Sequence, residues 1–177
     1  MDRLFKVLVI GSLLVGSAFG GNRVTEEEAL AFCRDVWFPR LVLGPGLTPA
    51  KVEEKLDALL PLYTDNAQLT DPNNSDLFAK KTLKGTEDLR RYYRAVLTHY
   101  PEWKFEIRAV YPTENGFVLH YTGRNAPPVT EFDGVDILEI QRGPDGTGVQ
   151  AFKIEKLEEF YDRLPFARKA GTEADSE

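Results

Sequence analysis

YTDNAQLTDP, residues 63–72, is the stretch that decides the fold of this chain. It predicts a helix end followed by a short strand that stops at Asp71-Pro72, because proline cannot donate to a strand ladder and is confined to strand ends and edges. Ala67, Leu69 and Asp71 alternate with other residues, so their side chains share one face of that strand. The segment KGTEDLRRYY, residues 84–93, then predicts a helix that begins near Thr86.

Two further helices are predicted upstream of this strand. Thr25 caps the first, because Glu28 stands where a capping box needs a carboxylate, and apolar residues recur at helical spacing as far as Trp37. The second begins at Thr48-Pro49, since proline is favoured at the first helical position. Pro61 lies in its last turn or breaks it.

The downstream half alternates between apolar and polar residues, which is typical of half-buried strands. Asn115-Gly116 is a hairpin signal between two of them. Strands are predicted near residues 103–109, 117–122, 131–141 and 148–153, and a C-terminal helix over residues 157–164. Helices followed by a run of antiparallel strands predict an α+β fold.

The N-terminus is typical of a secretory signal. Arg3 and Lys6 precede a charge-free apolar run, and Ala18 and Gly20 are small residues suited to a cleavage site. We therefore expect a signal peptide over residues 1–20, one domain over 21–169, and a disordered tail over 170–177. The expected location is secreted or extracytoplasmic, and an uncleaved membrane anchor is the alternative.

Charge and composition limit the kinds of partner. The net charge of −6 argues against binding to nucleic acid or to an anionic membrane surface, so membrane contact is expected only through an uncleaved N-terminal segment. Cys33 is the single cysteine and lies in an apolar helical stretch, which predicts a buried side chain. The two histidines and this cysteine show no metal-ligand spacing, and no metal or cofactor is predicted.

Two aspartates are the candidate catalytic residues. Asp71 is in phase with Leu69, and Asp136 is in phase with Leu138. Carboxylates that enter an apolar chamber lose hydration, which raises the pKa and permits one to act as a base while another stays protonated. Two alternatives remain: Asp71 is also a good turn former, and the opposite face of the Asp136 strand is equally apolar.

In this order, these pieces resemble the SnoaL-like and ketosteroid-isomerase-like families of the nuclear-transport-factor-2-like superfamily, over roughly residues 25–165. The resemblance implies a cone: a strongly curved, mainly antiparallel sheet wrapped around three N-terminal helices, with a short C-terminal helix. It implies a small hydrophobic ligand inside the cone, and a homodimer. It also implies Asp71 as base and Asp136 as protonated donor of an isomerase, cyclase or dehydratase. The residues expected to line the pocket are Phe32, Trp37, Leu69, Tyr92 and Leu138.

One departure keeps a second hypothesis open. The steroid isomerases use a tyrosine of the first helix as a second donor, whereas this first helix carries no tyrosine. Tyr63, Tyr92 and Tyr93 are the candidate substitutes. The alternative is a non-catalytic domain of the same fold, whose outer sheet face binds a second copy or another partner.

Overall fold

The computed structural model describes residues 23–44, 46, 48–74, 78–125, 131–143 and 148–161. The predicted signal peptide (residues 1–20) and the predicted tail (residues 170–177) lie outside the described residues. Among the residues that are described, no helix is both long and apolar enough to cross a membrane.

The first helical stretch is continuous but changes its winding. It runs through α1 (Glu26–Ala31), a π-helical turn (Phe32–Trp37) and α2 (Phe38–Leu41). The predicted capping box is confirmed: Glu28 N donates to Thr25 Oγ1 at 3.2 Å, and Thr25 N donates to Glu28 Oε2 at 2.9 Å. The wide turn comes just before Pro39, whose ring nitrogen has no hydrogen to donate to the preceding turn.

Two more helices flank β1 (Tyr63–Thr70) and β2 (Thr82–Lys84) in the sequence, one before β1 and one after β2. α3 (Pro49–Leu59) begins at the predicted cap, where Lys51 N donates to Thr48 Oγ1 at 3.3 Å. Pro61 falls in a short 3₁₀ turn (Leu60–Leu62) that leads into the first strand. α5 (Gly85–His99) opens at Gly85, whose positive φ of 80° suits glycine.

Six strands form one sheet in the order β2-β1-β6-β5-β4-β3. In this sheet β1 and β6 run parallel, and the other neighbours are antiparallel. The strands are β1 (Tyr63–Thr70), β2 (Thr82–Lys84), β3 (Lys104–Pro112), β4 (Gly116–Arg124), β5 (Glu131–Arg142) and β6 (Phe152–Tyr161).

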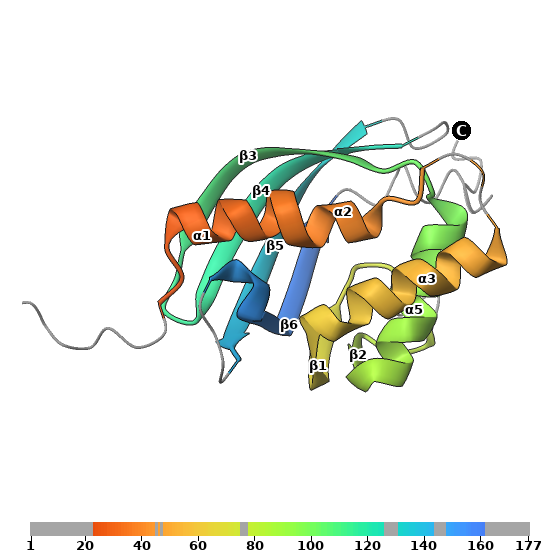
Figure 1. Ribbon diagram of the computed structural model, residues 1–177, viewed down its shortest axis with the longest axis horizontal. Coiled ribbons are helices and arrows are strands. Elements are labelled where there is room, and N and C mark those ends of the chain that lie inside the picture. Colours follow the sequence, from red (N-terminus) through yellow and green to blue (C-terminus); the bar gives the residue numbers. More distant parts are fainter. Residues whose placement is uncertain are drawn as a thin grey trace, which may run out of the picture.

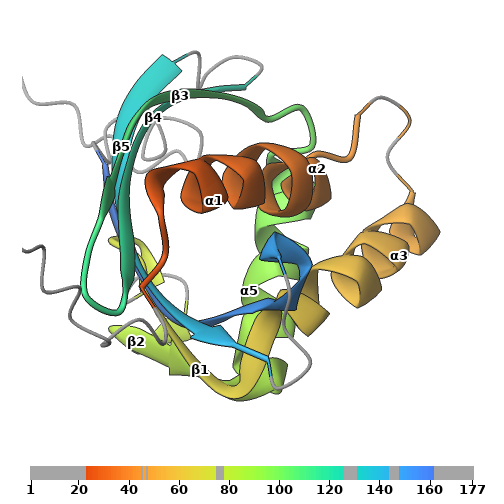
Figure 2. The same ribbon diagram turned by 60° about the vertical axis from the view of Figure 1, so that its left-hand side comes forward.

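The sheet bends around the first helical stretch. Figures 1 and 2 show β3, β4 and β5 curving over α1 and α2, while α3 and α5 lie beside the β1 end of the sheet. Register shifts interrupt the pairing of β3 with β4, of β5 with β6 and of β1 with β6, and such bulges bend a strand. The predicted α+β cone with a curved, mainly antiparallel sheet is confirmed.

The predicted C-terminal helix is wrong as far as residue 161. Residues 157–161 belong to β6, which pairs with β5 on one side and β1 on the other. Leu157, Phe160 and Tyr161 have helical spacing, but they lie on two faces of a strand: Leu157 is buried and Phe160 is 51% exposed. Pairing with two distant strands overrides this local pattern.

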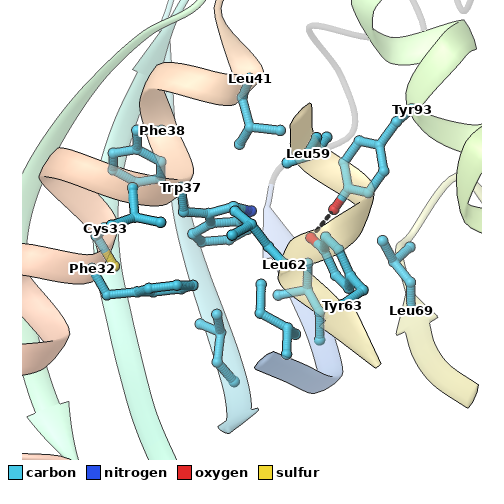
Figure 3. Close-up of a cluster of buried hydrophobic side chains, with 14 of the residues drawn as sticks. Phe32, Cys33, Trp37, Phe38, Leu41, Leu59, Leu62, Tyr63, Leu69 and Tyr93 are labelled. Atoms are coloured by element: carbon cyan, nitrogen blue, oxygen red, sulfur yellow. Dashed lines mark hydrogen bonds between the residues drawn. The ribbon is translucent and has the colours of Figure 1, made fainter. Parts of the chain in front are cut away.

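Buried apolar side chains from every layer cover the concave side of the sheet. Figure 3 shows one buried cluster in which Phe32 and Trp37 come from the first helical stretch, Tyr63 and Leu69 from β1, and Tyr93 from α5. Cys33 lies in the same cluster and is fully buried, as predicted.

Candidate functional site

Asp71 lies one residue beyond β1, on its concave face, and is 4% exposed. Its Oδ1 accepts from the backbone N–H of Asn73 at 2.6 Å, and its own carbonyl accepts from Asn74 N at 3.1 Å. Its Oδ2 accepts from the hydroxyls of Tyr92, at 3.0 Å, and Tyr161. The side chain therefore holds the turn with one oxygen and faces the cone with the other, so both interpretations of the sequence apply.

Asp136 points to the same side from β5. It is 2% exposed, whereas its neighbours Val135 and Ile137 are 36% and 37% exposed on the outer face. The ambiguity in its strand phase is thus resolved toward the inside. Among the described residues, no hydrogen-bond partner reaches its Oδ1. An acceptor left buried and unpaired is costly.

Burial is the main influence on the chemistry of Asp136. It raises the pKa of this carboxyl group well above the usual value, the nearby Tyr121 hydroxyl lowers it, and the negative charge of Asp71 raises it again. Asp136 also raises the pKa of the buried Cys33 thiol, after burial itself. The charge of Asp136 is thus felt in the first helical stretch, to which Cys33 belongs.

Glu159 is a third carboxylate that the sequence analysis missed. It pairs directly with Asp136 across β5 and β6, so the two side chains share the concave face. Thr70, the residue before Asp71, pairs with Glu158 across β1 and β6. Asp71, Glu159 and Asp136 therefore form one row across three adjacent strands.

The row is acidic, and no cation among the described residues pairs with it. Burial raises the pKa of Glu159 well above its usual value, followed by the charges of Asp71 and Asp136. Among the described residues, no lysine or arginine forms an ion pair with any of the three. Glu159, in the middle of the row, is half-buried, whereas Asp71 and Asp136 on either side of it are buried.

Hydroxyl groups surround the row in place of cations. Tyr92 Oη lies 3.0 Å from Asp71 Oδ2 and 2.9 Å from Glu159 Oε2. Asn73 Nδ2 donates to Tyr161 Oη at 2.9 Å. Tyr121 fits against Gly134 on the neighbouring strand, where an added Cβ would lie 2.5 Å from Cζ of its ring. Glycine at this position thus makes room for a phenol near Asp136.

The five residues predicted to line the pocket are all buried: Phe32, Trp37, Leu69, Tyr92 and Leu138. Tyr92 contacts the carboxylates directly, and the other four belong to the apolar cluster. In Figure 3 the indole nitrogen of Trp37 faces the Tyr63 and Tyr93 hydroxyls, which bond to each other. No acceptor among the described residues meets hydrogen-bond geometry with Trp37 Nε1.

The other hollows and titratable side chains of the described residues are less suited to a catalytic site. A hollow of about 590 Å³ lies by Leu60, Tyr63 and Thr86, but its Arg90 already pairs with Asp57 at 2.7 Å. His120 pairs with Val135 across β4 and β5 and lies on the outer face with it. Within the described ranges, no group of three His, Cys, Asp or Glu side chains is arranged to hold a metal ion.

A family profile described as a SnoaL-like domain matches residues 50–146, which is more than half of the chain. The chain belongs to the SnoaL-like domain family. Asp71 and Asp136 lie inside the matched part of this SnoaL-like domain, whereas Trp37 and Glu159 lie outside it. Among curated proteins, no significant match exists.

Solved structures share the fold of this SnoaL-like domain. A SnoaL-like protein of unknown function from Burkholderia thailandensis is 23% identical, with a TM-score of 0.55, over 78% of this chain and 98% of that one. A putative isomerase from Bacillus subtilis is 14% identical, with a TM-score of 0.54, over 85% and 98%. A protein with a ketosteroid isomerase-like fold from Catenulispora acidiphila, in complex with trimethylamine, is 15% identical, with a TM-score of 0.54, over 86% and 99%.

Proposed function

We propose that this SnoaL-like domain binds a small hydrophobic carbonyl compound on its concave side and carries out acid/base chemistry of the isomerase, cyclase or dehydratase type. One observation carries the proposal: Asp71 and Asp136 are buried on the same concave face in different hydrogen-bond environments. Carboxyl groups whose environments differ in this way can divide the acid and base roles.

Asp71 is suited to be the base. Its carboxylate accepts from one backbone N–H and two phenols, and an ionised carboxylate is an acceptor only. In the proposed step Asp71 takes a proton from a carbon next to the ligand carbonyl. The electron pair of that C–H bond moves onto the carbonyl oxygen as an enolate.

Asp136 is suited to be the donor. Burial raises its pKa, which favours a neutral carboxyl group whose O–H can donate to the enolate oxygen. Its unpartnered oxygen leaves bonding capacity for a ligand. Return of the proton from Asp71 to a different carbon completes an isomerisation with no net proton uptake.

A second hydrogen-bond donor to the ligand oxygen would come from the first helical stretch or from residues packed against it. Steroid isomerases use a tyrosine there, and this chain instead presents the indole N–H of Trp37 toward the Tyr63–Tyr93 pair. This N–H acts on the Tyr63 hydroxyl, whose pKa it lowers, so Trp37 would have to give up that interaction in order to donate to a ligand oxygen.

Deuterium exchange tests this proposal without knowledge of the natural substrate. Hydrophobic cyclic ketones and enones are incubated with the protein in D₂O, and loss of the signals of protons next to the carbonyl is followed by proton NMR. Exchange is expected with the native chain, should be lost in Asp71→Asn, and should be slowed in Asp136→Asn, because an asparagine amide donates more weakly than a carboxylic acid. Asp133→Asn is the matched control, because Asp133 lies on the same strand and bonds to Thr122 at 2.9 Å outside the cone. Exchange that survives in both test variants would refute the acid/base roles.

The outer sheet face supports a second proposal, a homodimer. Val135 pairs with Phe160 across β5 and β6, and Ile137 lies two residues further along β5 on the same face. These apolar side chains are 36%, 51% and 37% exposed. Light scattering after size exclusion should give twice the chain mass for the native protein, and the single chain mass for Phe160→Asp if this face is the interface.

Export is the third part of the proposal. Residues 1–20 are proposed to direct the chain out of the cytoplasm, so the chemistry would take place in a secreted or extracytoplasmic location. The support is the charge-free apolar run after Lys6.

A further inference from the structure

Tyr92 lies between two carboxyl groups and has only one proton to give. Its Oη is 3.0 Å from Asp71 Oδ2 and 2.9 Å from Glu159 Oε2, and both distances are ordinary for hydrogen bonds between oxygens. A phenol donates one hydrogen bond and can accept another. One of these two bonds must therefore be donated by a carboxyl group to Tyr92, and that carboxyl group must be protonated.

The other bonds show which carboxyl group holds the proton. Asp71 accepts from Asn73 N and from Tyr161, in addition to Tyr92. Tyr161 accepts from Asn73 Nδ2 at 2.9 Å, so its own proton points to Asp71. Asp71 thus has three donors, which suits a carboxylate, whereas Glu159 contacts the Tyr92 hydroxyl and the Asp71 carboxyl group itself, and the hydrogen bond to Asp71 raises the pKa of Glu159.

We propose that Glu159 is a neutral carboxylic acid that donates to Tyr92, and that Tyr92 donates to Asp71, so that Glu159 and Asp71 share one proton through the phenol. Nothing in the family match points to this residue, because Glu159 lies beyond the matched segment.

The surroundings agree with a neutral Glu159. The titratable groups that influence it or respond to its charge are carboxyls and phenols from β1, β4, β5, β6 and α5: Asp71, Asp136, Tyr63, Tyr92, Tyr93, Tyr121 and Tyr161. Burial, the two aspartate charges and a hydrogen bond to Asp71 raise the pKa of Glu159, while the Tyr92 hydroxyl lowers it. Its nearest charged neighbours are therefore of the sign that favours the protonated form.

The shared proton gives the row two states. When the Glu159 proton moves to Tyr92 and the Tyr92 proton moves to Asp71, Glu159 becomes the carboxylate and Asp71 becomes neutral. The two O–H bonds that break are replaced by two that form, and no proton enters or leaves. If the proposed acid/base function holds, on which this role rests, Asp71 can act as the base in the state that keeps the proton on Glu159, and the other state switches the base off.

Carbon NMR of the ligand-free protein tests the proton count by itself. The chain is labelled with ¹³C at the glutamate carboxyl carbon, and its carboxyl resonances are followed as the pH is raised. One resonance is expected to keep the shift of a protonated acid at neutral pH, after the surface glutamates have become carboxylates. Glu159→Gln should remove that resonance, whereas Glu158→Gln should leave it, because Glu158 faces outward and pairs with Lys156 at 2.6 Å.

A second variant tests the sharing. Asp71→Asn removes the negative charge that opposes ionisation of Glu159, so the titration midpoint of the Glu159 resonance should fall by about one pH unit or more. If Glu159→Gln does not fold, the shift in Asp71→Asn assigns the resonance. A Glu159 signal that titrates with the surface glutamates, or a midpoint that ignores Asp71→Asn, would overturn the proposal. Because no ligand is present, this result is independent of the deuterium-exchange test.

Discussion

Replacing Asp136 by asparagine removes one titratable group from the concave face without changing its size, and should stabilise the domain increasingly as the pH rises. Burial raises the folded-state pKa of Asp136 well above 3.8. Above 3.8 the unfolded chain ionises this group while the folded chain resists ionisation. The stability of the native protein is therefore complete below that value and declines as the pH rises through the folded-state pKa.

The magnitude follows from proton linkage. Each pH unit between the two pKa values costs the native protein about 1.4 kcal/mol of unfolding free energy for one such group. The asparagine variant would carry no such cost, because an amide does not titrate. The advantage of Asp136→Asn over the native chain should thus grow by about 1.4 kcal/mol per pH unit from about pH 4 upward.

Urea unfolding at about pH 5, 6 and 7 measures this difference. Asp133→Asn, on the outer face of the same strand, is the control for loss of a carboxylate outside the cone. Glu159 contributes equally to the native chain and to both variants while it remains neutral. Parallel stability curves for the native chain and Asp136→Asn would refute the reasoning, because they would mean that Asp136 is ionised in the folded protein.

Three further outcomes are expected. Asp71→Asn should destabilise the domain by about 1–3 kcal/mol at neutral pH, because an amide group would meet donors from Asn73 N and two phenols; unchanged urea midpoints would contradict this. Gly134→Ala should lower stability by about 1–3 kcal/mol, since its Cβ would lie 2.5 Å from the Tyr121 ring, and a thermal melt equal to that of the native chain would speak against the packing. Intact-mass analysis of exported protein should give a chain that begins near Gly21, and a membrane-bound species that keeps residues 1–20 would exclude cleavage.

The sequence was informative wherever a residue's role depends on its near neighbours. The Thr25–Glu28 capping box, the Thr48 cap and the phase of Asp71 with Leu69 are local patterns, and the structure confirms each of them. Asp136 was harder, because both faces of its strand look apolar. In the structure Leu138 lies in the core and Ile137 at the surface, so Asp136, which is in phase with Leu138, faces inward.

The position of Glu159 could not be predicted from the sequence, because β6 forms by pairing with β1 and β5, which are distant in the chain. Leu157, Phe160 and Tyr161 fit a helix, in which Glu159 would lie on the polar side. Period-two alternation of Leu157, Glu159 and Tyr161 was the available signal, and it competes with strong helix formers in the same segment. A bulge between Ile154 and Lys156 also shifts the phase of β6, so the alternation does not continue from the start of the strand.

The position of β6 has a consequence for the order of folding. It is the last strand that the structure describes, yet it sits between β1 and β5 in the middle of the sheet. The bond from Tyr161 to Asp71 joins residues 90 positions apart, and contacts of such long sequence separation form slowly because a large loop must close first. Until β6 enters, β1 and β5 each have an unpaired edge that is open to other chains. Assembly of the carboxylate row should therefore coincide with the slowest step of folding, and chains that stall before it are the ones most exposed to aggregation.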